Sequence, residues 1–321
     1  MSRKLAVVAA LGFVVSLVIL QQLPGLSDHA YLTDPPYEWH LTNSHNDGPG
    51  QISFFYGDQN GDIPIRGDWN GDGIDTAGIV REQDGNLFWH LKNSHSAGPA
   101  DITFTYGAPG DEPIAGDWNG DGVDTPGVIR ITGSAPTWYL RNSNTAGLGE
   151  ISLLYGDTTA SEIYITGDWN GDGTDTPGLA RYGEDPNYIK WHLRHSNDSG
   201  PANFSFRYGL NEGDQPAVGD WNGDRISTVG ILRVSLDNAN WEWHLRNLNS
   251  EGPADIAYRY GLATDRFIRF GGDWNGDGID TAGVIRESTP PPTTTTSTTT
   301  TTSTTSTTTS TTLLPLPTIP D

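Results

Sequence analysis

The stretch Gly116–Thr125, "GDWNGDGVDT", occurs five times in this chain of 321 residues. Four copies follow the pattern G-D-W-N-G-D-G-x-D-T, and the fourth copy along the chain, "GDWNGDRIST", departs from it. The copies begin at Gly67, Gly116, Gly167, Gly219 and Gly272. Their first aspartates stand at positions 68, 117, 168, 220 and 273, so the steps are 49, 51, 52 and 53 residues. This near-constant period indicates one supersecondary unit that packs against copies of itself.

Each repeat contains four short segments with the alternation and the β-branched and aromatic residues typical of strands. We name them A to D. Strand A leads into the Asp-rich stretch, as in "PIAGDW", and strand B leaves it, as in "PGVIR". Strand C is a Trp-rich segment such as Trp39–Ser44, and strand D is a segment such as Ile52–Gly57. Strands A and B are therefore expected to form a hairpin around the Asp-rich loop, with C and D completing a four-stranded sheet.

The ends of the repeated region are complementary halves. The region starts with a C–D pair, Trp39–Gly57, and stops after an A–B pair, Phe267–Arg286. We therefore predict an all-β, five-bladed β-propeller of four-stranded blades, closed by N-terminal C–D and C-terminal A–B strands, with Asp-rich hairpin loops. Closure leaves the ring without an open edge. An open solenoid is the alternative architecture, but it needs no complementary half-repeats at its ends.

Segments of different composition flank the predicted propeller domain, residues 37–287. Residues 1–23 begin with "MSRK" and continue with the apolar run Leu5–Leu20, which is typical of a cleaved signal peptide or of an uncleaved signal anchor. Residues 24–36 are expected to be a linker. Residues 288–321 form a Thr/Ser/Pro-rich tract that cannot build a core, which predicts a disordered stalk, O-glycosylated or unmodified. The protein is thus expected to be secreted or at the cell surface, membrane-anchored through residues 5–20 if the signal is retained.

Composition excludes several functional classes. A formal net charge of −22 would repel phosphate, which excludes a general nucleic-acid binder. The chain has no cysteine, so disulfides, thiol catalysis and thiolate metal sites are excluded. It contains no G-x-S-x-G, H-E-x-x-H, phosphate-loop or nucleotide-binding pattern, and its conspicuous polar residues belong to the repeat. A catalytic set should break the repeat at one place, so we expect that the protein is not an enzyme.

The Asp-rich loops predict bound Ca²⁺. Fourteen of the 40 acidic residues lie within them. Asp, Asn and Asp occupy loop positions 1, 3 and 5, Gly at position 6 permits a left-handed bend, and position 7 can add its carbonyl. The predicted ligands, which include the Asp at position 8, are Asp68, Asn70, Asp72 and Asp75; Asp117, Asn119, Asp121 and Asp124; Asp168, Asn170, Asp172 and Asp175; and Asp273, Asn275, Asp277 and Asp280.

The fourth loop is expected to be a weak or lost site. It retains Asp220, Asn222 and Asp224, but Arg225 replaces the position-6 Gly and Ser227 replaces the position-8 Asp. A non-Gly residue at a left-handed bend is strained. A guanidinium there also competes with a cation, and the Arg225 side chain is expected to bridge Asp220 and Asp224.

The stretch "GDWNGDGIDTAGIVR" resembles the FG-GAP or VCBS type of repeat, and the resemblance covers Tyr37–Glu287. It implies an integrin-alpha-like propeller with calcium in the hairpin loops. The family pattern D-x-[DN]-x-D-G-x-x-D places its last Asp at position 9, whereas this chain has Thr there and Asp at position 8. Integrin-like propellers also more often have seven blades than five. The first departure bears on the identity of the last calcium ligand.

Recurring tryptophans and arginines complete the repeat. Ten of the eleven tryptophans occupy two repeat positions, one in the loop and one in strand C. We expect both sets to pack between blades, and sugar stacking is the alternative, chiefly for the loop set. An Arg follows every loop, and we expect it to pair with a neighbouring carboxylate or carbonyl.

The leading functional hypothesis is an exported, calcium-binding, non-catalytic adhesion or interaction module at the cell surface. Its partner would be an unknown protein or glycan ligand, and the module itself is expected to be a monomer. The alternative is a lectin-like carbohydrate-binding propeller that uses the loop tryptophans. A propeller hydrolase with carboxylates in its central channel is the third hypothesis.

Overall fold

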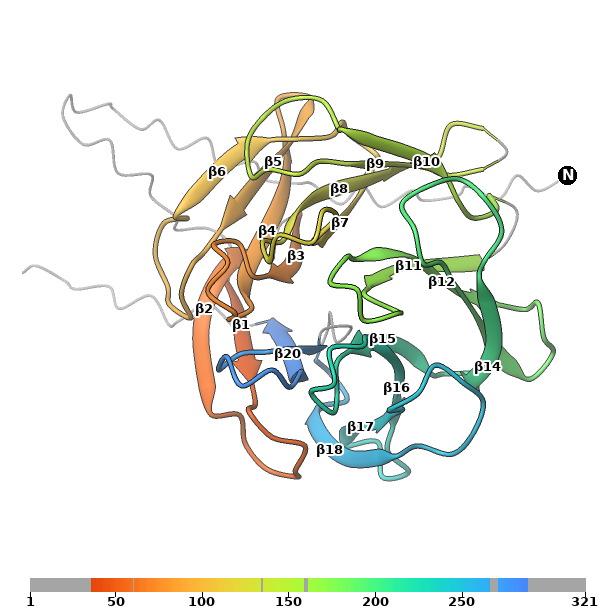
Figure 1. Cartoon of the computed structure of the whole chain (residues 1–321). Helices are drawn as coiled ribbons and strands as arrows, with labels where there is room; N and C mark the ends of the chain where they lie inside the picture. Colours follow the sequence, from red (N-terminus) through yellow and green to blue (C-terminus); the bar gives the residue numbers. More distant parts are fainter. Residues whose placement is uncertain (1–35, 60, 134, 159–160, 266–270, 288–321) are drawn as a thin grey trace, which may run out of the picture. The chain divides into compact units, whose positions relative to one another are not determined.

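The computed structural model describes residues 36–59, 61–133, 135–158, 161–265 and 271–287. The described residues form twenty strands in five four-stranded antiparallel sheets, arranged in a ring (Figure 1). None of them forms a helix that could span a membrane. The predicted five-bladed β-propeller is confirmed. The predicted signal segment, nearly all of the linker and the Thr-rich tail lie outside the described residues.

In four of the blades the strands follow one another in chain order, from the innermost strand to the outermost. Blade 2 contains β3 (Asp62–Gly67), β4 (Thr76–Gln83), β5 (Asn86–Leu91) and β6 (Ile102–Thr105). Blade 3 contains β7 (Glu112–Gly116), β8 (Thr125–Arg130), β9 (Thr137–Leu140) and β10 (Ile151–Leu154). Blade 4 contains β11 (Ser161–Gly167), β12 (Thr176–Tyr182), β13 (Tyr188–Leu193) and β14 (Phe204–Leu210). Blade 5 contains β15 (Gln215–Gly219), β16 (Thr228–Val234), β17 (Asn240–Leu245) and β18 (Ile256–Leu262).

Blade 1 joins the two ends of the domain. It contains β19 (Gly271–Gly272), β20 (Thr281–Glu287), β1 (Pro36–Leu41) and β2 (Ile52–Asp58). Strand β1 pairs with β20 from Tyr37 opposite Glu287 to Leu41 opposite Gly283. This sheet is the predicted closing blade, and it excludes the open solenoid. Most of the expected final strand A, residues 267–270, lies outside the described residues.

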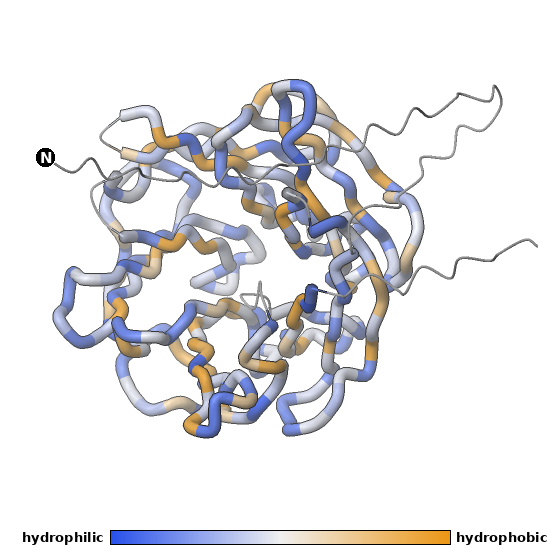
Figure 2. Tube along the Cα trace, turned by 180° about the vertical axis from the view of Figure 1, so that it is seen from behind, coloured by the Kyte–Doolittle hydropathy of each residue, from blue (hydrophilic) through white to orange (hydrophobic). Residues whose placement is uncertain are grey.

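The core consists of clusters that each combine one blade with residues of the next blade, and tryptophans fill much of it. The five strand-C tryptophans are at most 1% exposed, and each donates its indole N–H to a strand-D Tyr carbonyl, as Trp89 does to Tyr106 at 2.8 Å. The loop tryptophans are at most 3% exposed. The prediction of packing is confirmed, and ligand stacking on the loop tryptophans is wrong because no ring face is open. Figure 2 shows hydrophobic positions along the strands and hydrophilic ones in the surrounding loops.

An arginine and a carboxylate pair in every blade. Arg81 on β4 donates from Nε to Asp62 Oδ1 at 2.6 Å and from Nη2 to Asp62 Oδ2 at 2.7 Å. Asp62 also accepts the backbone N–H of Asp58, at the end of strand D of the preceding blade. This confirms the expected arginine pairing, while the acidic partners were not identified from the sequence. The five pairs are Arg81–Asp62, Arg130–Asp111, Arg181–Glu162, Arg233–Asp214 and Arg286–Asp265.

Candidate functional site

Each Asp-rich loop is organised by its position-1 carboxylate. Asp68 Oδ1 accepts the backbone N–H groups of Gly71 at 2.8 Å and Asp72 at 3.2 Å, and Oδ2 accepts that of Gly73 at 2.7 Å. Gly71 and Gly73 have φ values of 75° and 82°, in the left-handed region that favours glycine. The motif therefore folds into a turn wrapped around one carboxylate, with its polar side chains on the exposed side.

The loop brings together the predicted ligands at positions 1, 3 and 5. Asn70 Nδ2 donates to Asp72 Oδ2 at 2.9 Å, and Asp72 Oδ1 accepts the N–H of Ile74 at 3.0 Å. All side-chain acceptors are oxygens, which suits a hard cation such as Ca²⁺. Asp68 Oδ2 and both Asp72 oxygens each accept one hydrogen bond here and keep a second lone pair. Among the described residues, no three Asp, Glu, His or Cys side chains gather as a metal-binding group. Calcium in a loop would therefore be held by two carboxylates, the Asn carbonyl and the position-7 carbonyl, with water completing its coordination.

The position-8 aspartates contact the neighbouring loop. Asp124 Oδ2 accepts the backbone N–H of Asp68 in the preceding blade at 2.9 Å, and the Asp124 N–H donates to the Asp68 carbonyl at 2.8 Å. We call this pair of hydrogen bonds the inter-blade latch. It recurs at all five junctions, so the predicted position-8 ligands each commit one oxygen to the ring itself. The latched pairs are Asp75–Asp273, Asp124–Asp68, Asp175–Asp117, Ser227–Asp168 and Asp280–Asp220.

The latch explains the first glycine of the motif. A Cβ atom on Gly67 would lie 2.7 Å from Asp124 Oδ2, closer than atoms approach in proteins. The equivalent glycines of the other loops face their latch partners in the same way. Glycine is thus required here for the close approach of two blades.

The fourth loop keeps the shape of the others. Arg225 adopts a left-handed φ of 70°, as predicted, and its backbone N–H donates to Asp220 Oδ2 at 2.6 Å. The predicted guanidinium bridge is wrong, because the exposed Arg225 side chain forms no ion pair within the described residues. Asn222 still donates to Asp224 at 2.9 Å, and Ser227 Oγ accepts the Asp168 N–H at 3.1 Å. This junction is therefore latched without a charge.

The four position-8 carboxylates all interact electrostatically with one guanidinium, that of Arg66. Arg66 Nη1 on β3 lies 3.8 Å from Asp75 Oδ1, and Arg66 also interacts electrostatically with Asp124, Asp175 and Asp280. Burial raises the pKa of Asp175 and of Asp280 to about 7. Burial, with repulsion from Asp175 and Asp75, raises the pKa of Asp124 well above its usual value, while Arg66 opposes the rise. One arginine thus offsets only part of the buried negative charge.

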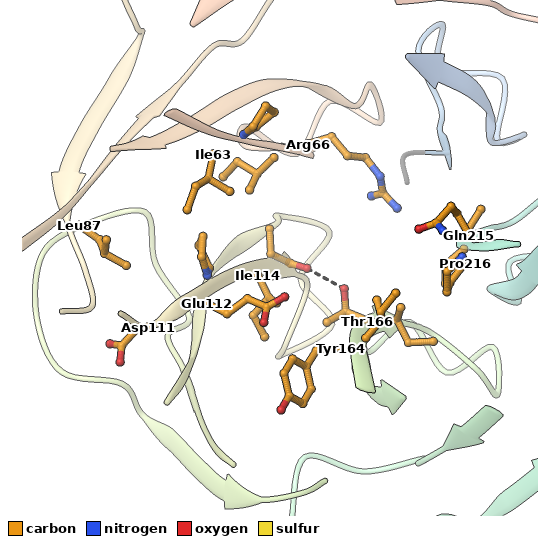
Figure 3. Close-up of a pocket in the computed structure, with 18 of the residues that line it drawn as sticks. Ile63, Arg66, Leu87, Asp111, Glu112, Ile114, Tyr164, Thr166, Gln215 and Pro216 are labelled. Carbon is orange, nitrogen blue, oxygen red and sulfur yellow. Dashed lines mark hydrogen bonds between the residues drawn. The ribbon is translucent and has the colours of Figure 1, made fainter. Parts of the chain in front are cut away.

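The central channel is a cavity of about 850 Å³. Residues of β3, β7, β11 and β15 line it, and most of its wall is apolar (Figure 3). The Arg66 guanidinium points into this space. Tyr164 on β11 and Gln215 on β15 also line it. The repeat motifs of the sequence do not point to these three residues. An alignment of the strand-A segments would have singled them out, because each differs from its counterparts in the repeat.

Fold and loops together define the class of this protein, a five-bladed β-propeller with Asp-rich hairpin loops. A solved lectin from Agrocybe aegerita, which recognises non-reducing terminal N-acetylglucosamine, is similar at 12% identity and a TM-score of 0.39, over 79% of this chain and 72% of that one. The Photorhabdus luminescens Tc holotoxin pore is similar at 13% identity and a TM-score of 0.40, over 78% of this chain but only 12% of that one. At such identities the similarity concerns the fold alone. The sequence matches no family model and no curated protein.

Proposed function

We propose that this propeller is an exported, calcium-stabilised and non-catalytic interaction module that mediates adhesion at the cell surface. The observation that carries the proposal is that repeated polar residues form structural contacts within the ring. The position-8 side chains latch neighbouring blades, and the arginines after the loops pair with buried carboxylates. Residues committed to such contacts stabilise the ring and are not available as a nucleophile or a general acid.

The proposal includes calcium in the loops and a repeat of the FG-GAP or VCBS type. Its support is the all-oxygen set at positions 1, 3 and 5, already assembled in each loop by the position-1 carboxylate. Bound calcium would neutralise part of the −22 charge and rigidify the face of the ring that carries the loops. The export signal and the Thr-rich stalk predicted from the sequence would place this domain outside the cell.

A binding experiment tests the interaction module. The purified full chain is immobilised and exposed to fractionated surface extracts and to intact cells, in calcium and in EDTA. We expect saturable binding that weakens in EDTA and in the Asp117→Ala variant. Equal retention by the heat-unfolded chain, or hydrolysis of chromogenic glycosides by the native chain, would contradict a non-catalytic interaction module.

A further inference from the structure

A serine, a histidine and a carboxylate of blade 4 are joined by hydrogen bonds. His192 on β13 lies directly opposite Ser205 on β14, and its Nδ1 atom is 2.8 Å from Ser205 Oγ. The His192 Nε2 atom lies 2.9 Å from Glu184 Oε2, in the turn between β12 and β13. Ser205 is exposed, whereas the His192 side chain is only 14% exposed. The three groups thus form a hydrogen-bonded chain that ends at an exposed serine.

The charge states of Glu184 and His192 fix the direction of these hydrogen bonds. Although burial favours the neutral carboxyl, hydrogen bonds from three side chains lower the pKa of Glu184 to about 2; the donors are Lys190, Arg181 and His192. The carboxylate can therefore only accept, so His192 Nε2 donates to it. Burial, partly offset by Glu184, lowers the pKa of His192, so its ring is neutral at pH 7. In a neutral ring that carries its proton on Nε2, Nδ1 is an acceptor, so the Ser205 hydroxyl donates to it.

The other blades show that this hydrogen-bonded chain is not needed to build a blade. The histidine position is occupied by Tyr139 in blade 3, and the serine position is occupied by Ala257 in blade 5. In blade 1, His40 lies opposite Ser53, but its ring hydrogen-bonds to Arg286 and, among the described residues, not to Ser53. The arrangement in blade 4 therefore departs from the repeat without a structural requirement that the other blades share.

A serine held in this way can attack an activated ester. Ser205 Oγ bonds to the carbonyl carbon of the ester while the hydroxyl proton moves to His192 Nδ1. The Glu184 carboxylate, which accepts from Nε2, stabilises the imidazolium that forms. The leaving oxygen departs with the electron pair of its C–O bond, and the acyl group remains on Oγ as a serine ester. The imidazolium then gives its proton to the leaving oxygen or to water, and the ring is neutral again.

We propose that Ser205 is an acyl-acceptor site for activated carboxylic esters, with His192 as the general base and Glu184 as a positioning residue. An activated ester is the fitting class because its leaving group departs as a stable anion and needs no acid to protonate it. The inference goes beyond the proposed interaction module, since it gives the surface of that module a point of covalent attachment. The product is a stoichiometric acyl-serine, so the site requires no turnover.

Reaction of the full chain with p-nitrophenyl acetate tests the site. We expect a burst of about one p-nitrophenolate per chain, as for an acyl group that accumulates on one serine. Peptide mass spectrometry should locate the acetyl group on Ser205. Ser53 and Ser152 are exposed serines at the same strand position of other blades, and they serve as internal controls. Each should be acetylated more slowly than Ser205 by about tenfold or more, because neither donates to a histidine.

Substitutions that the repeat already accommodates give the decisive comparison. Ser205→Ala introduces the residue type of blade 5 at this position, and His192→Tyr introduces that of blade 3. Both should abolish the burst without lowering the melting temperature, whereas the matched control Ser53→Ala should react like the wild type. Glu184→Gln should slow acetylation of Ser205. It should also lower the pKa of His192 in an NMR titration, because an amide does not stabilise the imidazolium as a carboxylate does.

Three results would overturn the inference. These are acetylation of Ser205 no faster than that of Ser53, an undiminished burst in Ser205→Ala, and an undiminished burst in His192→Tyr. An unchanged reaction and an unchanged His192 titration in Glu184→Gln would reject the positioning role. Steady turnover that Ser205→Ala abolishes would support the nucleophile, and it would contradict the non-catalytic character of the proposed interaction module.

Discussion

Asp124 and Asp68 lie in adjacent blades, 56 residues apart in the sequence, and are joined by two hydrogen bonds. Asp124 Oδ2 accepts the Asp68 N–H at 2.9 Å, and the Asp124 N–H donates to the Asp68 carbonyl at 2.8 Å. The same pair of hydrogen bonds joins Asp75 to Asp273, which are 198 residues apart in the sequence, and so closes the ring. The Asp-rich motif is thus an element of inter-blade structure, whether or not calcium occupies the loop.

The latch predicts different effects of two substitutions at Asp124. Asp124→Ala leaves the Asp68 N–H without its side-chain acceptor, and it should lower the free energy of unfolding by about 1–3 kcal/mol. Asp124→Asn keeps an acceptor oxygen and removes a buried charge, so its stability should equal or exceed that of the wild type. Urea denaturation measures both, with Glu212→Ala as an exposed control. Equal destabilisation by Ala and Asn would show that the charge matters and the hydrogen bond does not.

The raised pKa values predict a dependence on pH in calcium-free buffer. The pKa of Asp175 and of Asp280 is about 7 in the folded state, against an ordinary value of 3.8, mainly because of burial. Between these values the folded state binds more protons than the unfolded state, so their contribution to stability falls as pH rises from about 4 to 7. The double variant Asp175→Asn, Asp280→Asn lacks this fall.

The stability advantage of that double variant over the wild type should therefore grow from about pH 5 to pH 8. The arginine–carboxylate pairs are the same in both proteins, so their contribution cancels in the difference. Chemical denaturation at several pH values in EDTA measures this difference in the free energy of unfolding. A difference that does not change with pH would argue against raised pKa values at these two positions.

Calcium should stabilise the protein, and the fourth loop should contribute less to this stabilisation than the other four. An ion that binds only the folded state raises the free energy of unfolding by about 2.7 kcal/mol at a concentration of 100 times its Kd. Millimolar calcium should raise the melting temperature and EDTA should lower it. Native mass spectrometry should show that Asp117→Ala removes about one ion, while Asp220→Ala removes little or none, because the fourth loop carries the positive charge of Arg225 and has Ser227 in place of the position-8 carboxylate. Five equivalent ions in the wild type, or an unchanged melting temperature, would refute this prediction.

Closure predicts that the two ends of the domain depend on each other. A fragment of residues 64–287 lacks β1 and β2, so it exposes the edge of β20 and the apolar faces that blade 1 covers. It should aggregate or lose cooperative unfolding, whereas residues 36–287 should melt like the full chain. Size-exclusion chromatography and calorimetry compare the two. A monomeric 64–287 fragment with an undiminished melting temperature would contradict the requirement for closure.

The sequence by itself determined the architecture of this protein. The period of about 50 residues, the four strand patterns in each repeat and the half-repeats at the ends specify five blades and their closure. These features are local or periodic, and strand alternation and turn residues are encoded by neighbouring positions. Burial of the tryptophans followed from the same patterns, because large aromatics at repeated positions pack best between blades.

Only the tertiary structure decided which residues meet across the ring. A position-8 Asp lies within its own loop in the sequence, yet its carboxylate contacts the preceding blade, because adjacent loops approach closely at the inner edge of the ring. Arg66, Tyr164 and Gln215 come from three repeats and share one channel only once the ring has closed. Local patterning carries no signal for such contacts, since they depend on the packing of strands that are distant in the chain.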